Sequence, residues 1–428
     1  MPKRVNISNL AVIKRFLVRK CKISSCNRLT IHYLYCRLRQ LKAQVYAIIR
    51  VMDHQPTIGI IGGGQLGRML TLAALPLGFK VMVVNPSPDS PAAQVGAEEI
   101  VADLFDANAL QQLAQRVDYI TVEIEHLDAA RLSEIERLGK PVNPSADTIA
   151  LIQDKLLQKQ ALKAAGLPVA NFVEITDQVS AEAALTKFGG KMLLKSRLGA
   201  YDGRGNTVVK SVQELTQALQ AFGGATLYAE QFVDFKKELA IMISRDTSGN
   251  TASYPVVETI QQRNICTEVL APADISQAIT SQAVRIAEQT VEQLQGAGVF
   301  GIEMFLTADG QIIINEIAPR VHNSGHYTQD ANRTSQFEQH IRAISGLPLG
   351  STDLIAPAAA MINILGDREG PTEINGLAEA LSDPNVSVHL YGKSPTKVDR
   401  KMGHITATGE TLEIARQRAQ IARKALNV

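Results

Sequence analysis

The sequence predicts a mixed α/β fold, α+β overall, and three observations support this class. Residues 57–85 alternate a strand, a glycine-rich turn, a helix and a second strand, which is typical of a parallel sheet with helices packed on it. Residues 168–345 hold more strands, separated by glycine-rich loops. An Asp-Gly pair at 309–310 lies between two apolar, β-branched runs, which predicts a tight hairpin turn.

The N-terminal part of the fold is predicted to be a Rossmann-like domain over residues 53–150. TIGII from Thr57 and KVMVVN from Lys80 are apolar, β-branched runs, and GGGQLGRMLTLAALPLG between them predicts a loop and a helix. DYITVEIE from Asp118 predicts a further strand, followed by a helix and a turn at 141–144. We expect the first domain boundary near residue 150.

The segment Gly62–Gly67 satisfies the pattern G-x-G-x-x-G after a strand and before a helix. Such a loop can bind phosphate through backbone N–H groups and the helix N-terminus. An NAD site also needs an acid at the end of the second strand to hold the ribose, and this chain has Asn85-Pro86-Ser87 there. The pattern therefore disfavours NAD and leaves a simpler phosphate or ribose-phosphate ligand open.

The middle of the chain, residues 151–350, is predicted to form a second domain. A helical segment over 145–165 ends at Gly166-Leu167-Pro168, a glycine stop followed by proline. Lys195 ends the apolar strand MLLK and precedes a glycine-rich loop, so its ammonium could reach phosphate oxygens; a solvated hairpin is the alternative. The run 230–233 follows a strand and resembles a hinge that binds adenine through its backbone, which on its own is a weak signal.

Two glutamates in the predicted hairpin could form a cation site. If 309–310 is a two-residue loop, Ala308 faces Gln311, and Glu303 then faces Glu316. Directly opposed residues have Cβ atoms about 4.5–5.5 Å apart, so these carboxylates would repel unless a cation lay between them. Mg²⁺ suits such a pair, since it takes one or two carboxylates and leaves other positions to water and phosphate. The alternative is two exposed glutamates that diverge into solvent, and a one-residue slip would move one of them to the other face.

Two polar clusters follow the hairpin. The run 315–326 contains Glu316, Arg320, His322 and His326 within twelve positions. This density of ionisable side chains exceeds that of an ordinary surface loop and predicts a functional site. The predicted C-terminal domain, residues 351–428, has short strands, a terminal helix from about Thr411, and a second cluster. Its members are Lys397, Arg400, Lys401 and His404. A solvated basic face remains the alternative for that cluster.

Composition and charge exclude several classes. Hydrophobic content of 45% and charged content of 20% are ordinary for a globular protein, and no apolar run is long enough to span a membrane. The net charge is +2, and residues 1–52 carry twelve Lys and Arg without any acid, so the remainder carries 2 − 12 = −10. An acidic body gives no support to nucleic-acid binding.

The basic extension 1–52 is expected not to be part of the folded enzyme. A mis-set start is favoured over a targeting segment or a functional arm, and we expect residues 52–428 to fold and act alone. Three of the four cysteines, Cys21, Cys26 and Cys36, lie in the extension and fit no zinc template well. With Cys266 alone in the body, a reducing cytoplasm is the expected compartment.

Four motifs together resemble the ATP-grasp superfamily, and within it the 5-(carboxyamino)imidazole ribonucleotide synthases of purine biosynthesis. They are GGGQLGRM (62–69), QDKLLQKQ (153–160), AYDGRGN (200–206) and NEIAPRVHNSGHYTQ (315–329), and the resemblance runs from Thr57 to the C-terminus. It implies an ATP-grasp architecture and the ATP- and bicarbonate-dependent carboxylation of aminoimidazole ribonucleotide through carboxyphosphate. The implied cofactors are ATP and Mg²⁺, with Mn²⁺ as a substitute, and neither biotin nor NAD.

The resemblance also implies roles for individual residues. ATP would be bound by Lys155, Lys195, Ala200, Tyr201, Asp202, Gly203, Arg204, Gly205, Asn206, Glu230, Gln231, Phe232, Val233, Glu238, Asn315 and Glu316. The metal would be held by Glu303 and Glu316. Substrate would contact Gly64, Gln65, Leu66, Glu123, Arg320, His322, Asn323, Lys397, Arg400 and Lys401. Catalysis would involve Arg320, His322, Lys401 and Arg204, with His322 as the first choice of proton acceptor.

Ala200 and Asn206 depart mildly from the family, whose loops often begin with Gly and end with Gln. The departures put the mobility of the loop in doubt rather than activity. The nearest rival is a sister ATP-grasp enzyme that uses formate and glycinamide ribonucleotide, and a non-catalytic nucleotide-binding protein is the alternative from another class. The expected partners are small molecules and a second copy of the chain in a homodimer, with no nucleic acid and no membrane.

Overall fold

The computed structural model describes residues 55–199 and 205–428. Contacts divide the chain into two compact units, of which Pro56–Val428 is the second. The predictions for the extension 1–52 and for five loop residues (Ala200, Tyr201, Asp202, Gly203 and Arg204) lie outside the described residues. Within the described residues, no helix combines the length and the apolar character that crossing a membrane requires.

A four-stranded parallel sheet opens the described chain, as predicted. Its strands are β1 (Thr57–Ile61), β2 (Lys80–Asn85), β3 (Glu98–Val101) and β4 (Tyr119–Val122), in the order β3-β2-β1-β4. The connecting helices are α3 (Gln65–Ala74), α4 (Ala107–Arg116) and α5 (Ala129–Arg137), with short 3₁₀ turns η1 (Leu75–Leu77) and η2 (Ala93–Val95). The predicted strand 118–125 is too long, because the Glu123 side chain turns back to accept the N–H groups of Gly64 and Leu66.

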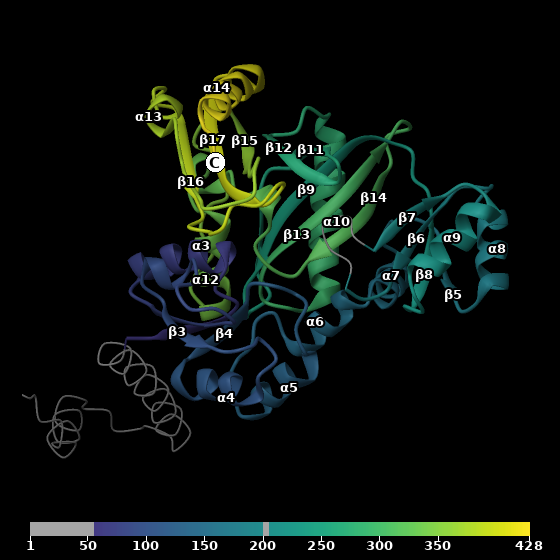
Figure 1. Ribbon diagram of the computed structural model, residues 1–428, viewed down its shortest axis with the longest axis horizontal. Coiled ribbons are helices and arrows are strands. Elements are labelled where there is room, and N and C mark those ends of the chain that lie inside the picture. Colours follow the sequence, from purple (N-terminus) through teal and green to yellow (C-terminus); the bar gives the residue numbers. More distant parts are fainter. Residues whose placement is uncertain (1–54, 200–204) are drawn as a thin grey trace, which may run out of the picture. The chain divides into compact units, whose positions relative to one another are not determined.

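A smaller antiparallel sheet follows, with two helices packed on it (Figure 1). Its strands are β5 (Phe172–Ile175), β6 (Met192–Ser196), β7 (Asn206–Val209) and β8 (Leu227–Gln231), in the order β5-β8-β6-β7. The helices α8 (Gln178–Lys187) and α9 (Val212–Ala221) bury Ala184 and Leu215 against it. Side chains of Asp177 and Ser211 cap these two helices, as such residues do at N-termini.

The described residues also form a nine-stranded sheet, in the order β14-β13-β9-β11-β12-β15-β17-β16 with β10 paired to β9. Its strands are β9 (Phe235–Arg245), β10 (Thr251–Ser253), β11 (Val257–Gln262), β12 (Ile265–Ala271), β13 (Gly298–Thr307), β14 (Ile312–Ala318), β15 (Ala358–Leu365), β16 (Val386–Leu390) and β17 (Lys401–Gly409). Because β12 pairs with β15, the sheet continues past the boundary predicted at 350. The predicted domain limits stay predictions.

Helices pack on this sheet and share hydrophobic cores with it. The long α10 (Gln277–Leu294) packs its buried face against β9 and β14, and α14 (Leu412–Ala425) packs against β15 and β17 (Figure 1). Four shorter helical elements also belong to this part of the chain: η3 (Asn323–Gly325), α11 (Thr328–Ala331), α12 (Gln336–Ser345) and α13 (Leu377–Ala380). Buried apolar side chains at alternate positions of β9 (Leu239, Ile241, Ile243) and of β13 (Phe300, Ile302, Met304, Leu306) line one face of the sheet, as expected for period-two patterning.

The helical segment predicted over 145–165 is split into α6 (Ala146–Gln153) and α7 (Lys155–Ala164). Asp154 lies between them, and its carboxylate accepts the N–H groups of Leu156 and Leu157. Arg197, which directly follows β6, donates to the same carboxylate at 2.6 Å. The cap thus places Lys155 at the first position of a new helix.

The hairpin predicted at 309–310 is confirmed, but the predicted loop length of two residues is wrong. Thr307 N donates to Gln311 O and Gly310, at a φ of +84°, donates to Thr307 O, so three residues form the loop. Leu306 therefore faces Ile312, one residue out of the predicted register. A bulge at Asn315 restores that register, and Glu303 faces Glu316 as predicted.

Candidate active site

A cavity of about 600 Å³ lies where the nine-stranded sheet, the smaller sheet and the loop after β4 meet. Its charged and polar lining comes from all three parts. The predicted site residues that line it are Lys195, Asn206, Glu238, Glu303, Asn315, Glu316, Arg320, His322, Asn323 and Lys401. Lining residues that sequence reasoning did not assign to the site include Glu125, His126, Gln261, Asn264 and Cys266.

The two hairpin glutamates occupy one wall of this cavity. Lys155 Nζ lies 2.6 Å from Glu316 Oε1. Burial alone would raise the pKa of Glu316, but the ammonium groups of Lys155 and Lys195 lower it below its ordinary value. Among the described residues, no lysine or arginine forms an ion pair with Glu303; the Nε2 of the neutral His322 ring lies 3.7 Å from its Oε1. Burial, then the negative charges of Glu316 and Glu238, raise the pKa of Glu303 to about 7.

This donor set fits a hard divalent cation. The wall offers two carboxylates and the Asn315 side chain, and Mg²⁺ prefers oxygen ligands of this kind. The raised pKa of Glu303 is what an acid shows when its charge is not neutralised. Glu303 and Glu316 would hold the ion. In this structure the ammonium of Lys155 compensates the charge of Glu316.

Lys195 is fixed at the cavity by a buried ion pair. Its Nζ lies 3.6 Å from Glu230 Oε2, and Lys159 Nζ lies 3.3 Å from Glu230 Oε1. Lys159 also donates to Ile314 O at 3.1 Å. Glu230 is 4% exposed, so its side chain serves these lysines, and a role in adenine binding would rest on its backbone. Sequence reasoning missed Lys159, which lies one helical turn after Lys155.

The other hinge residues do not line the cavity. Gln231 accepts a hydrogen bond from Asn171 at 2.8 Å, and the ring of Phe232 lies 3.3 Å from Lys191 Nζ. Val233 and Gly205 are likewise absent from the cavity lining. Glu238 does line it, and burial raises its pKa.

Arg320 is held by an acid that sequence reasoning missed. Its Nε and one terminal nitrogen donate to the two carboxylate oxygens of Glu125, at 2.5 and 3.1 Å. Burial would raise the pKa of Glu125, but the Arg320 guanidinium outweighs it and lowers the pKa to about 2. The bidentate pair fixes the plane of the guanidinium. Glu125 lies two residues after Glu123 in the same loop. This proximity to a predicted site residue was the one feature of the sequence that could have identified it.

The predicted substrate residues of the glycine-rich loop surround Glu123. Its buried carboxylate accepts the N–H groups of Gly64 at 2.5 Å and Leu66 at 3.0 Å. Burial raises the pKa of Glu123, partly offset by these backbone hydrogen bonds. Gly62 is required here, because its φ is +109° and a Cβ would lie 2.7 Å from Glu123 Oε2. The glycines therefore make room for a carboxylate of this chain.

The C-terminal cluster is brought to the site only in part. Lys401 lines the cavity, whereas Lys397 is exposed and Arg400 donates to Pro395 O at 2.6 Å. Lys393, which was not predicted, contacts Gln65 and donates to Lys401 O at 2.9 Å. The loop that carries these residues thus reaches the glycine-rich loop through Lys393.

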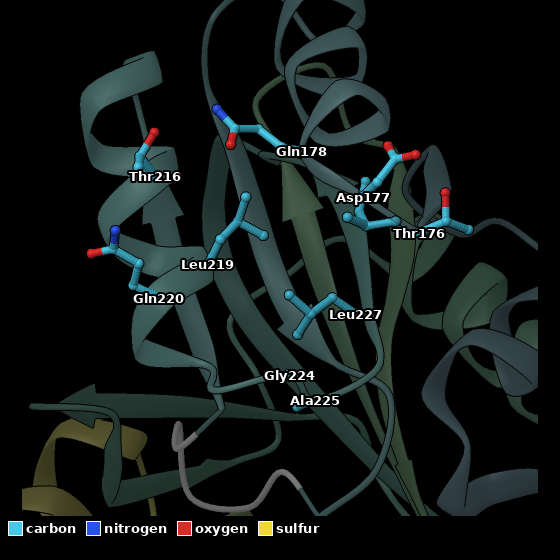
Figure 2. Close-up of a pocket in the computed structure, with 10 residues that line it drawn as sticks. Thr176, Asp177, Gln178, Thr216, Leu219, Gln220, Gly224, Ala225 and Leu227 are labelled. Carbon is cyan, nitrogen blue, oxygen red and sulfur yellow. The ribbon is translucent and has the colours of Figure 1, made fainter.

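A second hollow of about 440 Å³ lies on the smaller sheet, between α8 and α9 (Figure 2). It is lined by side chains such as Thr216, Leu219, Gln220 and Leu227. Its one acid, Asp177, caps α8. This hollow therefore lacks a cluster of charged side chains like that of the larger cavity.

Comparison with known families defines the class of protein. The ribonucleotide synthetase preATP-grasp domain matches residues 55–153, the ATP-grasp domain residues 160–337, and the phosphoribosylaminoimidazole carboxylase C-terminal domain residues 359–418. The fold and the site thus define an ATP-grasp ligase.

Individual relatives narrow this class. The N5-carboxyaminoimidazole ribonucleotide synthase of Synechococcus elongatus is 44% identical over 82% of this chain and 88% of its own. The crystal structure of the Thermotoga maritima synthetase superposes with a TM-score of 0.79 at 44% identity, covering 87% of this chain and 99% of that one. An Aspergillus clavatus synthase in complex with ADP and 5-aminoimidazole ribonucleotide gives 0.79 at 37% identity, covering 86% and 98%. The chain belongs to the family of N5-carboxyaminoimidazole ribonucleotide synthases, ATP-dependent enzymes of purine biosynthesis.

Proposed function

We propose that this chain carboxylates the amine of 5-aminoimidazole ribonucleotide with bicarbonate, at the cost of one ATP. The observation that carries the proposal is that one cavity joins the paired Glu303 and Glu316, the ammonium of Lys195, and the Arg320–His322 segment. Phosphoryl transfer needs positioning and charge neutralisation more than covalent chemistry by the protein. These groups supply both.

The reaction balances in three steps. A bicarbonate oxygen attacks the γ-phosphorus of ATP, and the bond to the bridging oxygen of ADP breaks, which gives carboxyphosphate. Carboxyphosphate breaks down to CO₂ and phosphate. The exocyclic amine of the ribonucleotide attacks the CO₂ carbon and loses one proton, which gives the N5-carboxy product.

At the nucleotide end, Lys155 and Lys195 would contact phosphate oxygens. The proposal is supported by their positions: Lys195 lines the cavity, and Lys155 forms an ion pair with Glu316 of its wall. Glu303 and Glu316 would hold Mg²⁺, or Mn²⁺ in its place, and the ion would neutralise charge on the phosphates. Asn206, Glu238 and Asn315 complete the oxygen- and nitrogen-bearing wall.

At the other end, Arg320 and His322 would face bicarbonate and the ribonucleotide. Glu125 holds the Arg320 fork in one plane, ready for an oxyanion. Burial, then the positive charges of Arg320 and Lys401, lower the pKa of His322 to about 4, so its imidazole is neutral at physiological pH. Its Nδ1 accepts the Ser324 N–H and lies 2.8 Å from Ser324 Oγ, so Nε2 carries the hydrogen of the neutral ring and faces Glu303. As the proposed proton acceptor, His322 would use the other tautomer, in which Nδ1 donates to Ser324 Oγ and Nε2 is free to accept.

The ribonucleotide would extend from Arg320 toward the glycine-rich loop. Gly64, Gln65, Leu66 and Glu123 meet Lys393 there, so we add Lys393 to the predicted substrate residues. Lys397, Arg400 and Lys401 keep their predicted role at the substrate phosphate, supported by family resemblance and, for Lys401, by its place at the cavity. The loop 200–206 would exclude water from carboxyphosphate, as water-labile intermediates require.

A kinetic experiment tests the proposal. The full chain is given MgATP and either 5-aminoimidazole ribonucleotide or glycinamide ribonucleotide, and ADP release is followed with bicarbonate, with formate, and with neither. Labelled bicarbonate is traced into product. Bicarbonate-dependent ADP release with label in an acid-labile carbamate is the expected result. Formate-dependent release with glycinamide ribonucleotide, or no release with any acid, would overturn the proposal.

We further propose that the enzyme acts as a cytoplasmic homodimer, on the support of the family resemblance. Light scattering of the purified full chain measures its mass directly. We expect twice the 46.4 kDa of one chain, and a monomeric mass at assay concentration would contradict the dimer.

A further inference from the structure

Three side chains outside the catalytic cavity bring metal-binding atoms together. Asp330 of α11, His389 of β16 and His404 of β17 each offer one ligand atom, and these atoms lie within 4.8 Å of one another. His389 Nε2 lies 2.9 Å from Asp330 Oδ2. None of the three residues lines the 600 Å³ cavity. They form a separate cluster, which we call the Asp–His–His cluster.

The fold fixes the positions of these residues. His389 and His404 are direct partners across the antiparallel pair β16–β17, so their side chains share one face of the sheet. Their rings stack with centroids 4.7 Å apart. The opposite face of β17 carries Ile405 and Ala407 and packs under α14. The cluster face therefore meets α11, which supplies Asp330.

One buried ring nitrogen of the cluster, His404 Nε2, is available to bind a ligand. His404 has no solvent exposure, and its Nε2 has no hydrogen-bond partner among the described residues. Its Nδ1 lies 2.9 Å from the hydroxyl of Tyr391. If Nδ1 donates to Tyr391, Nε2 presents a lone pair. That is the arrangement of a metal-ligating histidine, whose other ring nitrogen donates to a neighbouring acceptor.

A second buried histidine beside the cluster has the same deficit. His326 also has no exposure, its ring centroid lies 5.1 Å from that of His404, and its Nε2 is unpartnered among the described residues. The Gln336 amide nitrogen donates to His322 O and faces His326 Nδ1 at 3.1 Å. Nδ1 of His326 is therefore the acceptor, and its Nε2 carries a hydrogen for which the described residues offer no acceptor. A hydroxide or other oxygen bound beside His404 would satisfy it.

We propose that Asp330, His389 and His404 form a binding site for a divalent transition-metal ion of the Zn²⁺ class. Two imidazoles and one carboxylate favour zinc or cobalt over the oxygen-seeking Mg²⁺. Coordination requires the partly exposed His389 ring to tilt out of its stack with His404 and to exchange its hydrogen bond with Asp330 for a bond to the ion. The bound ion would clamp α11 to the β16–β17 pair.

Metal titration of the full, untagged chain tests this proposal. The protein is stripped with a chelator and kept in excess Mg²⁺, so that the carboxylates of the catalytic cavity are occupied. Zn²⁺ binding is measured by calorimetry, and Co²⁺ binding by its visible absorption. Thiolate ligation adds an intense near-ultraviolet band, so Co²⁺ bound by Cys21, Cys26 or Cys36 would be recognised separately.

The expected result is one more equivalent of Zn²⁺ in the wild-type chain than in Asp330→Asn, His389→Gln and His404→Asn. Tyr391→Phe removes the neighbour of His404 Nδ1 and should weaken binding by roughly 10- to 100-fold. Glu303→Gln, at the catalytic wall, should bind Zn²⁺ like the wild type. Equal binding in the wild type and the three ligand variants, or none in the wild type, would overturn the proposal. Asp330 and His389 are partly exposed, so their variants decide the question if His404→Asn does not fold.

Discussion

Glu123 beside the glycine-rich loop and the hairpin pair Glu303 and Glu316 have their charges compensated in opposite ways. In the glycine-rich loop, Glu123 accepts backbone N–H groups of Gly64 and Leu66 at the start of α3. In the hairpin, Glu303 and Glu316 face each other across β13 and β14. The loop carboxylate is satisfied by the backbone, whereas the hairpin carboxylates repel each other.

Burial raises the pKa of Glu123 and of Glu303 alike, so burial does not separate the two sites. What separates them is the neighbouring charge. Backbone dipoles are permanent, and an acid they hold is part of the fold. An acid opposed by another acid needs an external cation. The comparison supports the proposal that the hairpin binds a cation, and it assigns the Glu123 contact to the stability of the loop.

Removing the hairpin charge should have the largest effect. Glu316→Gln should lower kcat for ATP turnover on the order of 10²- to 10³-fold, the range seen when one preorganised electrostatic contact is lost. Steady-state ADP release measures it, and circular dichroism checks the fold. Glu288→Gln, at an exposed position of α10, is the control and should retain full activity. Near-normal turnover in Glu316→Gln would remove Glu316 from the metal site.

Arg320 lies just beyond the hairpin and should affect a different ligand. Arg320→Ala should raise the KM for the ribonucleotide about 10- to 100-fold, the equivalent of a charged hydrogen bond, and leave ATP affinity unchanged. Arg320→Lys keeps the charge opposite Glu125 but loses the planar fork, so it separates fold from function. Arg285→Ala, at an exposed site, is the control. Unchanged ribonucleotide kinetics would exclude Arg320 from the substrate site.

The hairpin also predicts a pH dependence that the loop does not. The folded-state pKa of Glu303 is about 7, above its ordinary value of 4.5, so the stability from this group is present below 4.5 and is lost as pH rises through 7. Mg²⁺ must displace that proton. Its affinity should therefore fall about tenfold for each pH unit below 7 and level off above it.

Calorimetric Mg²⁺ titrations across this pH range measure the slope, and Glu303→Gln should abolish this part of it. A slope that is the same in the wild type and the variant would show that another group titrates.

Glu123→Gln should have the smallest effect, on stability. Its amide offers one acceptor where the carboxylate has two, so the free energy of unfolding should fall by about 1–3 kcal/mol. Denaturant unfolding measures it. Glu99→Gln is the matched control, because Glu99 also accepts two backbone N–H groups, those of Asp89 and Ser90, but at a more exposed position. An equal loss in both variants would contradict the special role of burial at Glu123.

The sequence predicted the elements well because their patterns are local. The parallel sheet and the apolar strand that ends at Lys195 follow from periodicity and turn residues. The Glu303–Glu316 pair was predicted correctly from a wrong turn. A three-residue loop and the bulge at Asn315 shift the register in opposite directions, and no local pattern distinguishes that combination from a plain two-residue loop.

The missed site residues share a physical reason. Glu125 pairs with Arg320 across 195 positions, and Lys393 contacts Gln65 across 328. Such contacts depend on how sheets pack together and leave no periodic signal in either segment. The split at Asp154, by contrast, could have been found, because an acid followed by free N–H groups is a common helix start.

The most direct test of the central claim is the binding of Mn²⁺ in the presence of ADP, followed by electron paramagnetic resonance. The full wild-type chain is compared with Glu303→Gln/Glu316→Gln and with the control Glu288→Gln. The account predicts that wild type and control lower the free Mn²⁺ signal below that of the same Mn²⁺ and ADP without protein, and that the double variant does not. Mn²⁺ binding of equal strength in the double variant would show that the hairpin carboxylates do not hold the ion.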